Sequence, residues 1–301
     1  MKIACIYHNS IFCSWNFSQG IMSKLREMGH EAIDLGFVNR ESEPDWSRVT
    51  EEPDFVLVTG PEHTPDKVRM GRKWKCPTAY WFHETLDRVD HDFLPTYQVM
   101  VKDADFNFFI REQDAKLLGG YHLPFAVDTT YFDIDGAPEW DKRKYKVATV
   151  GQLYPSRRKF LDEVRALTSV PIEVLQFVGE GKSPEEMVKA LADSHRDTQV
   201  FISLPAMIRT TVCKTFEAAA CGCCVITPVP NLEQDDNYAH LEVLRYDEAE
   251  PLTLAARLDL LIEEFEDVAK ATAKLGYQRT MRDHRLDQRL QRIIDVVGGK
   301  K

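Results

Sequence analysis

The sequence predicts an α/β protein with two doubly wound domains, each built around a parallel sheet. Its 301 residues exceed what one ordinary hydrophobic core accommodates and suit two α/β domains. Short apolar runs of strand type alternate with helical segments, which is the rhythm of consecutive βαβ units. That rhythm breaks once, between residues 124 and 146, where turn-forming residues, acids and then a basic cluster replace it. We therefore expect one domain on each side of this break.

The expected N-terminal domain covers residues 1–124. Its single well-defined helix is predicted at residues 17–29, where apolar Ile21, Met22 and Leu25 precede the closing Gly29. The run at residues 54–59 is almost continuously apolar, as expected of a strand buried on both faces of a parallel sheet. Strands are predicted at residues 2–7, 30–35, 54–59, 78–82 and 106–110.

A connecting segment over residues 125–144 is expected to lead into a C-terminal domain over residues 145–284 and a final helix over 285–301. An amphipathic helix is predicted at residues 252–262, and long helices follow from residue 263 with a break at Gly276. Strands are predicted at residues 145–150, 172–178, 198–203 and 223–227.

Composition narrows the class of protein. The formal net charge of −10 argues against broad affinity for nucleic acid or membrane surfaces. No apolar run reaches membrane-span length, and the apolar start is too short for a signal peptide. Seven cysteines, an odd number, favour a reduced cytoplasmic chain. The spacing of Cys221, Cys223 and Cys224 differs from that of zinc ligands, so we interpret them as buried thiols and expect no metal site.

The sequence of residues 211–227 predicts one helix followed by one strand. Thr210 or Thr211 is a candidate cap for the helix, and Gly222 is a candidate terminator. Lys214 and Glu217 lie just ahead of a run of small residues that would allow close packing. Free backbone N–H groups at a helix start beside a cation make a good phosphate site. An exposed ion pair between Lys214 and Glu217 is the plain alternative.

A second phosphate candidate follows the first strand of the C-terminal domain. Gly151 lets the backbone turn close to a ligand, and Gln152 comes next. Arg157, Arg158 and Lys159 then stand at a helix start, where positive charge opposes the helix dipole. This placement favours a bound diphosphate, with Arg157 the first choice, over an ordinary solvated helix start.

Further polar candidates stand after other predicted strands, at the edge where α/β sheets bind ligands. Arg209 and Thr211 could contact phosphate or sugar hydroxyls, although a solvated cation and a plain helix cap are alternatives. In the first domain His83, at the end of a buried strand, is a candidate acid/base or sugar contact, although a lone histidine is more often structural. The candidates on the acceptor side are Glu84, Glu62, His8 and Asn9, which ordinary loop polarity explains about as well. The loops of the two domains are expected to form one cleft.

Several segments together resemble the glycosyltransferases of the GT-B fold, and among them the spore maturation glycosyltransferase-like proteins. The specific part is Phe216-Glu-Ala-Ala-Ala-Cys-Gly222, and residues 123–132, 150–161 and 274–284 support it. No G-x-G-x-x-G motif follows the first strand, which counts against a dehydrogenase. The resemblance implies two facing Rossmann-like domains, with the final helix crossing back to the first.

The resemblance also implies residue roles. Glu217 would hold the donor ribose, Arg157 the donor diphosphate with Lys214 close by, and His83 would lie near the transferred sugar. Two positions depart from the family pattern. Arg209 stands where many retaining members have a glutamate, and Gln152 stands where an arginine is usual.

The expected activity is transfer of a sugar, most simply a hexose, from a nucleoside diphosphate to a hydroxyl acceptor. Retention of configuration and independence of metal and cofactor are expected, because protein cations would stabilise the leaving diphosphate. The acceptor stays open. Glycosylation of hydroxymethylated pyrimidines in DNA is one alternative, weakly favoured by basic residues at 142–146 and 274–292. A non-catalytic nucleotide-sugar-binding protein and a nucleotide-sugar epimerase are the others.

Overall fold

The fold consists of two compact units. The computed structural model describes residues 1–8, 18–38, 43–60, 74–88, 91–175, 183–207, 210–229 and 237–299. The first unit comprises Met1–Ala126, Met207–Thr210 and Leu286–Lys301, and the second comprises Val127–Ala206 and Thr211–Arg285. The segment expected to connect the domains therefore belongs, from Val127 onward, to the second unit.

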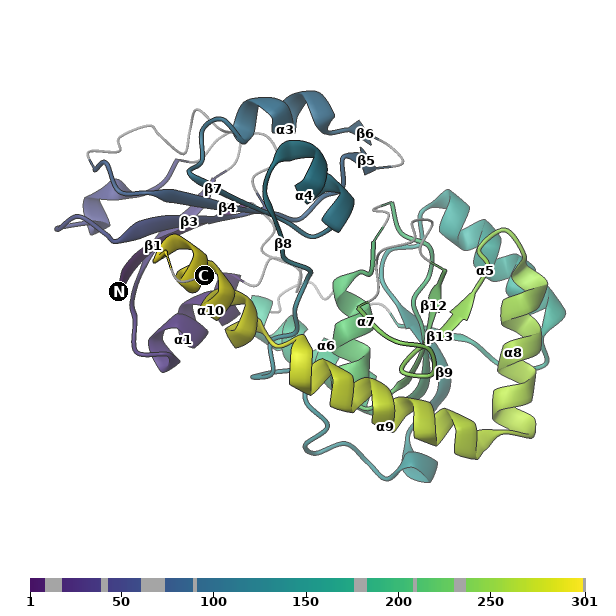
Figure 1. The fold of residues 1–301 in the computed structure, drawn as a ribbon. Coiled ribbons are helices and arrows are strands. Elements are labelled where there is room, and N and C mark those ends of the chain that lie inside the picture. Colours follow the sequence, from purple (N-terminus) through teal and green to yellow (C-terminus); the bar gives the residue numbers. More distant parts are fainter. Residues whose placement is uncertain are drawn as a thin grey trace. The chain divides into compact units, whose positions relative to one another are not determined.

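The first unit is built on a parallel sheet with the order β2-β1-β3-β4-β7-β8. Helices α1 and α10 cover one face of this sheet, and α3 and α4 cover the other (Figure 1). The strands are Lys2–His8 (β1), Glu31–Val38 (β2), Phe55–Thr59 (β3), Thr78–Phe82 (β4), Phe106–Phe109 (β7) and Tyr121–His122 (β8). The helices are Ser18–Glu27 (α1), Leu94–Met100 (α3), Glu112–Leu118 (α4) and Leu286–Val297 (α10). The short pieces are the 3₁₀ helix Trp46–Arg48 (η2) and the antiparallel pair Asp87–Arg88 (β5) and His91–Asp92 (β6).

Buried aromatic side chains hold the first unit together. Every residue of β3 and β4 is buried, as their continuous apolar sequences predict. The Phe82 ring stacks on Phe109 with centroids 4.7 Å apart, and Tyr97 of α3 lies 4.4 Å from Phe82. Helix α10, at the far end of the chain, is fixed here because the Nε of Arg289 donates to the carbonyl of Pro124 over 3.0 Å.

The second unit has a parallel sheet with the order β10-β9-β11-β12-β13. Helices α5 and α8 cover one face, and α6, α7 and α9 cover the other (Figure 1). The strands are Tyr145–Val150 (β9), Glu173–Leu175 (β10), Thr198–Ile202 (β11), Cys224–Pro228 (β12) and Leu244–Tyr246 (β13). The helices are Pro155–Leu167 (α5), Pro184–Arg196 (α6), Cys213–Ala220 (α7), Pro251–Glu263 (α8) and Glu266–Asp283 (α9), and Trp140–Lys142 is the 3₁₀ helix η3.

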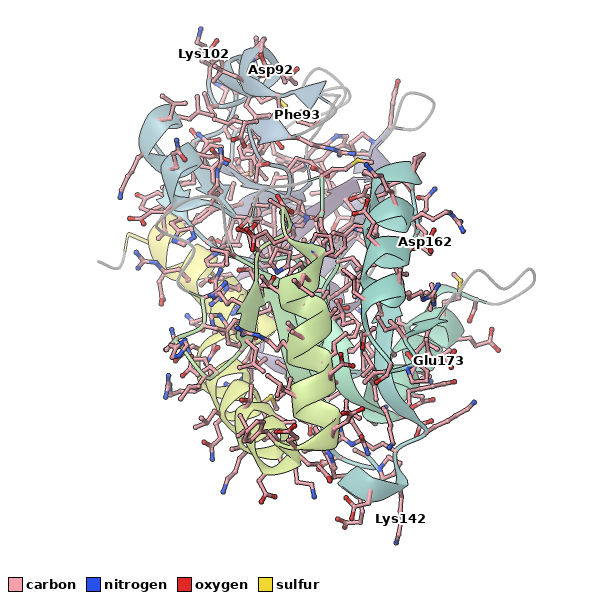
Figure 2. The ribbon with its side chains drawn as sticks, turned by 90° about the vertical axis from the view of Figure 1, so that its right-hand side faces the viewer. Asp92, Phe93, Lys102, Lys142, Asp162 and Glu173 are labelled. Atoms are coloured by element: carbon pink, nitrogen blue, oxygen red, sulfur yellow. The ribbon has the colours of Figure 1, made fainter. Side chains whose placement is uncertain are left out.

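Side chains that alternate in direction along the strands of the second sheet pack on both of its faces. Val200 and Ile202 of β11 join the core beneath α5 and α8, while Phe201 between them packs on His195 of α6. Charged side chains such as Asp162 of α5 and Glu173 of β10 are exposed and project outward (Figure 2). The second unit thus has a core on each face of its sheet and a charged exterior.

The strand order fixes where this unit can bind a ligand. The chain starts the sheet at β9, places β10 on one side and then crosses to place β11 on the other. In doubly wound sheets, ligands bind beyond the carboxyl ends of the strands at such a switch point. A ligand-binding site is therefore expected at the turns that follow β9 and β11.

Two expectations about helices are wrong in detail. Helix α7 begins at Cys213 with Val212 in the capping position and no side-chain cap, so neither threonine caps it. Helix α9 runs without a break through Gly276. A Cβ at that position would lie 2.6 Å from the carbonyl oxygen of Glu242, so the glycine permits close packing and does not end the helix.

The end of α7 is held by a buried arginine. Gly222 closes the helix with a φ of +73°, as its position in the sequence predicts. The Nη1 of Arg143 donates to the carbonyls of Gly222 and Thr198, each over 2.8 Å. A cation at this end of a helix complements its dipole. Arg143 lies in the segment expected to be a linker, and this contact explains why that segment belongs to the second unit.

Replacing Arg143 with methionine should lower the free energy of unfolding by about 3 kcal/mol, because two buried carbonyls lose a charged donor. Urea unfolding followed by circular dichroism measures the change. Lys142→Met is the matched control, since Lys142 is the exposed neighbour in the sequence (Figure 2). Equal stabilities of the two variants would contradict the assigned role.

Candidate active site

Two cationic side chains converge on the backbone at Gly151, directly after β9. Gly151 has a φ of +119°, which disfavours any other residue. A Cβ built there would overlap the Nζ of Lys214 and would lie 3.6 Å from the Nη1 of Arg157. The two phosphate motifs expected from the sequence therefore meet at one point, with Gly151 leaving room between the cations.

Lys214 is the second residue of α7, and its ammonium group bends back to the sheet. Its Nζ donates to the carbonyl oxygen of Val150 over 3.1 Å, and the side chain is half-buried. The first backbone N–H groups of α7 lie in the same turn of helix and have no acceptor within the helix. Lys214 thus brings positive charge to the end of β9, beside the start of a helix.

Arg157 lies on the other side of Gly151 and contacts the backbone of two turns. Its Nε and Nη2 donate to the carbonyl of Pro205 over 3.0 and 2.8 Å, and its Nη1 donates to the carbonyl of Gln152 over 3.0 Å. The guanidinium carbon lies 4.5 Å from the centroid of the Tyr154 ring. Burial lowers the pKa of Arg157, but a guanidinium stays protonated in proteins.

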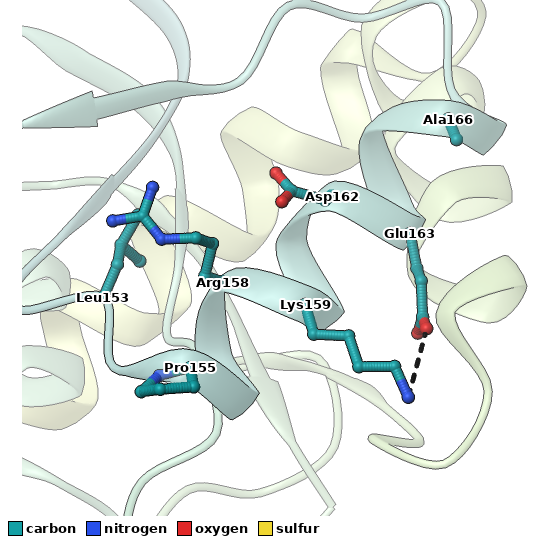
Figure 3. A pocket seen from close by; sticks show the side chains of 7 residues that line it. All are labelled: Leu153, Pro155, Arg158, Lys159, Asp162, Glu163 and Ala166. Atoms are coloured by element: carbon teal, nitrogen blue, oxygen red, sulfur yellow. Dashed lines mark ion pairs between the residues drawn. The ribbon is translucent and has the colours of Figure 1, made fainter.

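The other two cations of α5 are placed elsewhere. Arg158 and Lys159 are exposed and line a shallow hollow along the outer side of the helix (Figure 3). The Nζ of Lys159 lies 3.8 Å from Glu163 within this hollow. Gln152 is also exposed. It accepts the hydrogen bond from Arg157 through its backbone carbonyl oxygen. Among the described residues, Arg157 is the one of these three cations whose side chain donates hydrogen bonds to the turns that follow β9 and β11.

Glu217 is buried one turn beyond Lys214, next to a buried histidine. Its side chain is 1% exposed, and its Oε2 lies 4.0 Å from the Nε2 of His195, which is fully buried. Burial, with the charges of Lys214 and Arg196, lowers the pKa of His195 to about 3. The ring is therefore neutral at physiological pH, and the pair is not an ion pair.

The three cysteines at the end of α7 are buried and unbridged, as the sequence predicts. Burial raises the pKa of Cys223 to about 12. Its Sγ lies 3.1 Å from the carbonyl of His195, as a weak donor. These thiols are packing groups of the helix–strand joint.

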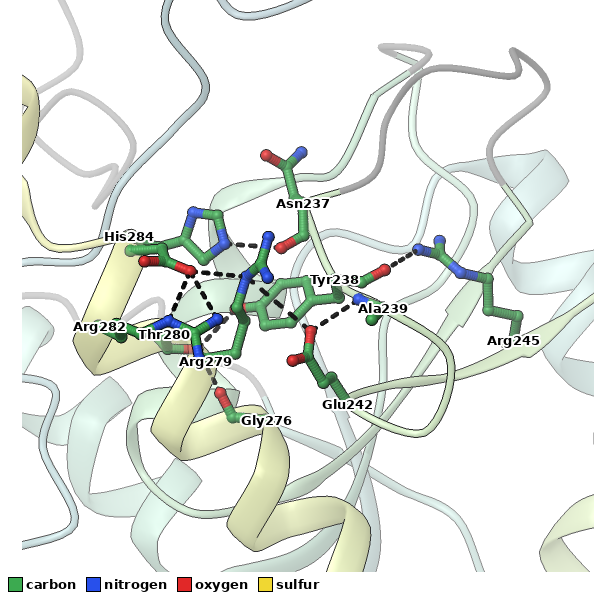
Figure 4. A network of polar contacts seen from close by, with 11 residues as sticks. Asn237, Tyr238, Ala239, Glu242, Arg245, Gly276, Arg279, Thr280, Arg282 and His284 are labelled. Carbon is green, nitrogen blue, oxygen red and sulfur yellow. Dashed lines mark hydrogen bonds and ion pairs between the residues drawn. The ribbon is translucent and has the colours of Figure 1, made fainter.

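A polar network fixes the outer side of α7. The Tyr238 hydroxyl donates to the Oγ1 of Thr280 over 2.7 Å, and that hydroxyl donates to the carbonyl of Gly276 over 2.7 Å (Figure 4). His284 lies 2.7 Å from the carbonyl of Asn237 through its Nε2. The rings of Tyr238 and His284 pack on Phe216, the neighbour of Glu217. Gly276, Thr280 and His284 lie in the segment 274–284 that supports the family resemblance, but their contacts with Asn237 and Tyr238 were not predicted, because 42 and 47 residues separate the partners.

Thr211 is 8% exposed and precedes the capping residue of α7. Arg209, which the sequence places among the donor contacts, lies outside the described residues. The same holds for Asn9 and Glu62 of the acceptor-side candidates. For His8, the backbone forms part of β1, and its side chain lies outside what the structure describes.

In the first unit, the described candidates follow β4. His83 is 3% exposed, and its ring packs edge-on against Trp81 with centroids 4.8 Å apart. Glu84 pairs with Arg88 over 3.0 Å.

A second charged cluster, which the sequence did not reveal, joins Arg111 to Asp114 and Asp87. The carboxyl edge of this sheet therefore carries paired charges around a buried imidazole.

Comparison with known proteins identifies the class. A family profile described as glycosyl transferase-like matches residues 127–295, which is more than half of the chain. The chain therefore belongs to this family, and it is a glycosyltransferase. A comparison with curated protein sequences found no match. No helix within the described ranges combines the length and the apolar character needed to cross a bilayer.

Solved structures agree on the fold. Sucrose-phosphate synthase from Thermosynechococcus elongatus is 12% identical with a TM-score of 0.71, each chain being covered to 98%. HepE from Anabaena, solved with UDP and glucose, is 10% identical with a TM-score of 0.67, covering 99% of this chain and 100% of its own. An alpha-glucosyltransferase solved with UDP and a 13-mer DNA is 11% identical with a TM-score of 0.64, at 99% and 100% coverage. The predicted GT-B fold class is confirmed.

Proposed function

We propose that this glycosyltransferase takes its sugar from a nucleoside diphosphate, and that the donor diphosphate binds beside Gly151. The observation that carries the proposal is the convergence of Lys214 and Arg157 on that glycine. It occurs after β9, at the switch point of the second sheet, where this class of fold binds ligands. A glycine there leaves the backbone accessible to an anion, and two cations attract it.

The proposed role of this site in the reaction is to stabilise the nucleoside diphosphate as the leaving group. Negative charge grows on the diphosphate as the glycosidic bond breaks, and Lys214 and the start of α7 would stabilise it together with Arg157. Such a preorganised donor is typically worth about 2.7–4 kcal/mol in the transition state. Because protein cations supply this charge, we propose transfer without a resident metal or cofactor.

The remaining roles follow the family resemblance. Glu217 would hold the donor ribose, and His83 would lie near the transferred sugar. We assign Gln152, Arg158, Arg209 and Thr211 to the donor side, and His8, Asn9, Glu62 and Glu84 to the acceptor side. The stretch Phe216–Gly222 supports membership of the spore maturation glycosyltransferase-like group and a retaining hexosyl transfer.

Charge pairing on α9 bears on the acceptor. Arg279 and Arg282, within the basic stretch 274–292, both contact Asp283, over 3.0 and 2.8 Å. This carboxylate offsets part of the positive charge that favoured DNA, and with the net charge of −10 it leads us to propose a small or glycan acceptor. The DNA-bound structural relative keeps hydroxymethylated DNA as the second candidate. An electrophoretic shift assay at two salt concentrations decides, because phosphate contacts weaken steeply with salt.

A thermal-shift screen against UDP-, GDP-, ADP- and dTDP-sugars tests the donor. A true donor at 100 times its Kd should stabilise the folded state by about 2.7 kcal/mol, and the matching sugar 1-phosphate should not. Release of free nucleoside diphosphate then confirms turnover. If no nucleotide sugar raises the melting temperature and none is consumed, the proposed function is wrong.

A further inference from the structure

We propose that Arg157 and Tyr154 form a latch on the carbonyl of Pro205, and that this latch positions residues 203–206, the turn that follows β11. Arg157 then has a positioning role in addition to the charge that it brings to the proposed diphosphate site. The effect on turnover rests on the proposed function, whereas the effect on the backbone does not.

The centre of the latch is one carbonyl oxygen that accepts three side-chain hydrogen bonds. Tyr154 donates its hydroxyl over 2.7 Å, and Arg157 donates Nε over 3.0 Å and Nη2 over 2.8 Å. A carbonyl oxygen has two lone pairs, so the Pro205 oxygen is fully used by this contact. Proline has no N–H of its own to tie to a neighbouring strand. The side-chain donors therefore anchor the chain at Pro205 through its carbonyl oxygen alone.

Arg157 also connects two turns that lie far apart in the sequence. Its Nη1 donates to the carbonyl of Gln152, in the turn after β9, while its other nitrogens bind the turn after β11. The two turns flank the switch point of the sheet. A guanidinium is a rigid planar fork that contacts the two carbonyls from separate nitrogens, whereas an ammonium group is a single nitrogen on a flexible stem. The guanidinium group of Arg157 lies against the Tyr154 ring, and this contact fixes the direction in which its N–H groups point.

A second tyrosine holds the same segment two residues earlier. The buried Tyr246 hydroxyl donates to the carbonyl of Ser203 over 2.9 Å, and its ring stacks on Phe160 of α5. The N–H of Ser203 donates to the carbonyl of Ile226 over 2.8 Å. The chain is thus fixed at Ser203 and again at Pro205. Seven residues separate Pro205 from Cys213, the start of the helix that carries Lys214.

A latch and a simple charge predict different results for Arg157→Lys. Lysine keeps the positive charge but has neither the rigid fork nor the planar face that stacks on Tyr154. If the geometry matters, Arg157→Lys should lower kcat/KM by about 30-fold although the charge is kept, and Arg157→Ala, which also loses the charge, should lower it further. Tyr154→Phe, which loses one neutral hydrogen bond, should cost about fivefold. Activity of Arg157→Lys within threefold of the wild type would overturn the latch.

Amide hydrogen exchange supplies a readout that needs no donor. The amides of Leu204 and Ala206 should exchange at least tenfold faster in Arg157→Lys and in Tyr154→Phe than in the wild type. The matched control is Arg165→Lys on the same helix, where the arginine donates to the carbonyl of Ile172 over 2.6 Å, away from these turns. Unchanged exchange at both amides would also overturn the proposal. Faster exchange in a protein that consumes no nucleotide sugar would support the latch and reject the proposed function.

Discussion

Replacing Lys214 with methionine should lower kcat by about 10²- to 10³-fold while the protein stays folded. Methionine has a similar length and fits the half-buried path toward Val150, but it brings no charge to Gly151. The ammonium group is proposed to act on charge that develops as the diphosphate leaves, so its loss should appear in kcat more than in KM. Steady-state kinetics with the donor found by the thermal-shift screen measures both constants.

The matched control is Lys189→Met on α6. Lys189 is exposed and pairs with Glu185 on the surface, so its removal should change kcat by less than twofold. Melting temperatures of the two variants separate loss of fold from loss of chemistry. If Lys214→Met keeps kcat within threefold of the wild type, the ammonium group does not stabilise the leaving group.

The strands buried on both faces were predictable because their sequences are apolar without interruption. Residues 78–82 form β4 with the expected bounds and are buried throughout, whereas residues 145–150 form β9 with the expected bounds but are buried only from Val147 onward. Strand β13 has three residues, too few for any pattern to stand out. Gly276 was misread because a glycine that permits close packing and a glycine that ends a helix look alike in a sequence. The difference lies in Glu242, a residue from another segment.

The site was predictable as two separate motifs but not as one arrangement. A glycine after a strand and a lysine at a helix start each indicate phosphate binding, and both are present. Their meeting depends on the fold of the second unit, in which α7 packs against β12 and α9 and Lys214 reaches the carbonyl of Val150, more than 60 positions earlier. Pro205 carried no signal at all, because its part in the structure is its carbonyl oxygen, which every residue has. No pattern in the sequence singled out His195, which lies in the last turn of α6.

Acid should destabilise the protein through His195, and the variant His195→Gln should lose less stability. Burial holds the pKa of this ring at about 3 in the folded protein, against about 6.5 when it is unfolded. Between these two pKa values His195 binds a proton in the unfolded state but not in the folded state, so the free energy of unfolding falls as the pH falls. At pH 4 the loss amounts to about 3 kcal/mol, and above pH 6.5 it vanishes.

Urea unfolding of wild type and His195→Gln at pH 7, 5.5 and 4 isolates this contribution, because the acidic residues common to both cancel in the difference. The difference in unfolding free energy should move in favour of the variant by about 3 kcal/mol between pH 7 and pH 4. His240→Gln, which alters an exposed histidine of the same unit, is the control and should follow the wild type. Parallel curves for His195→Gln and the wild type would mean that the folded protein protonates His195 readily. In that case the imidazolium 4.0 Å from Glu217 would pair with the carboxylate proposed to hold the donor ribose, and donor affinity would fall with acid instead of stability.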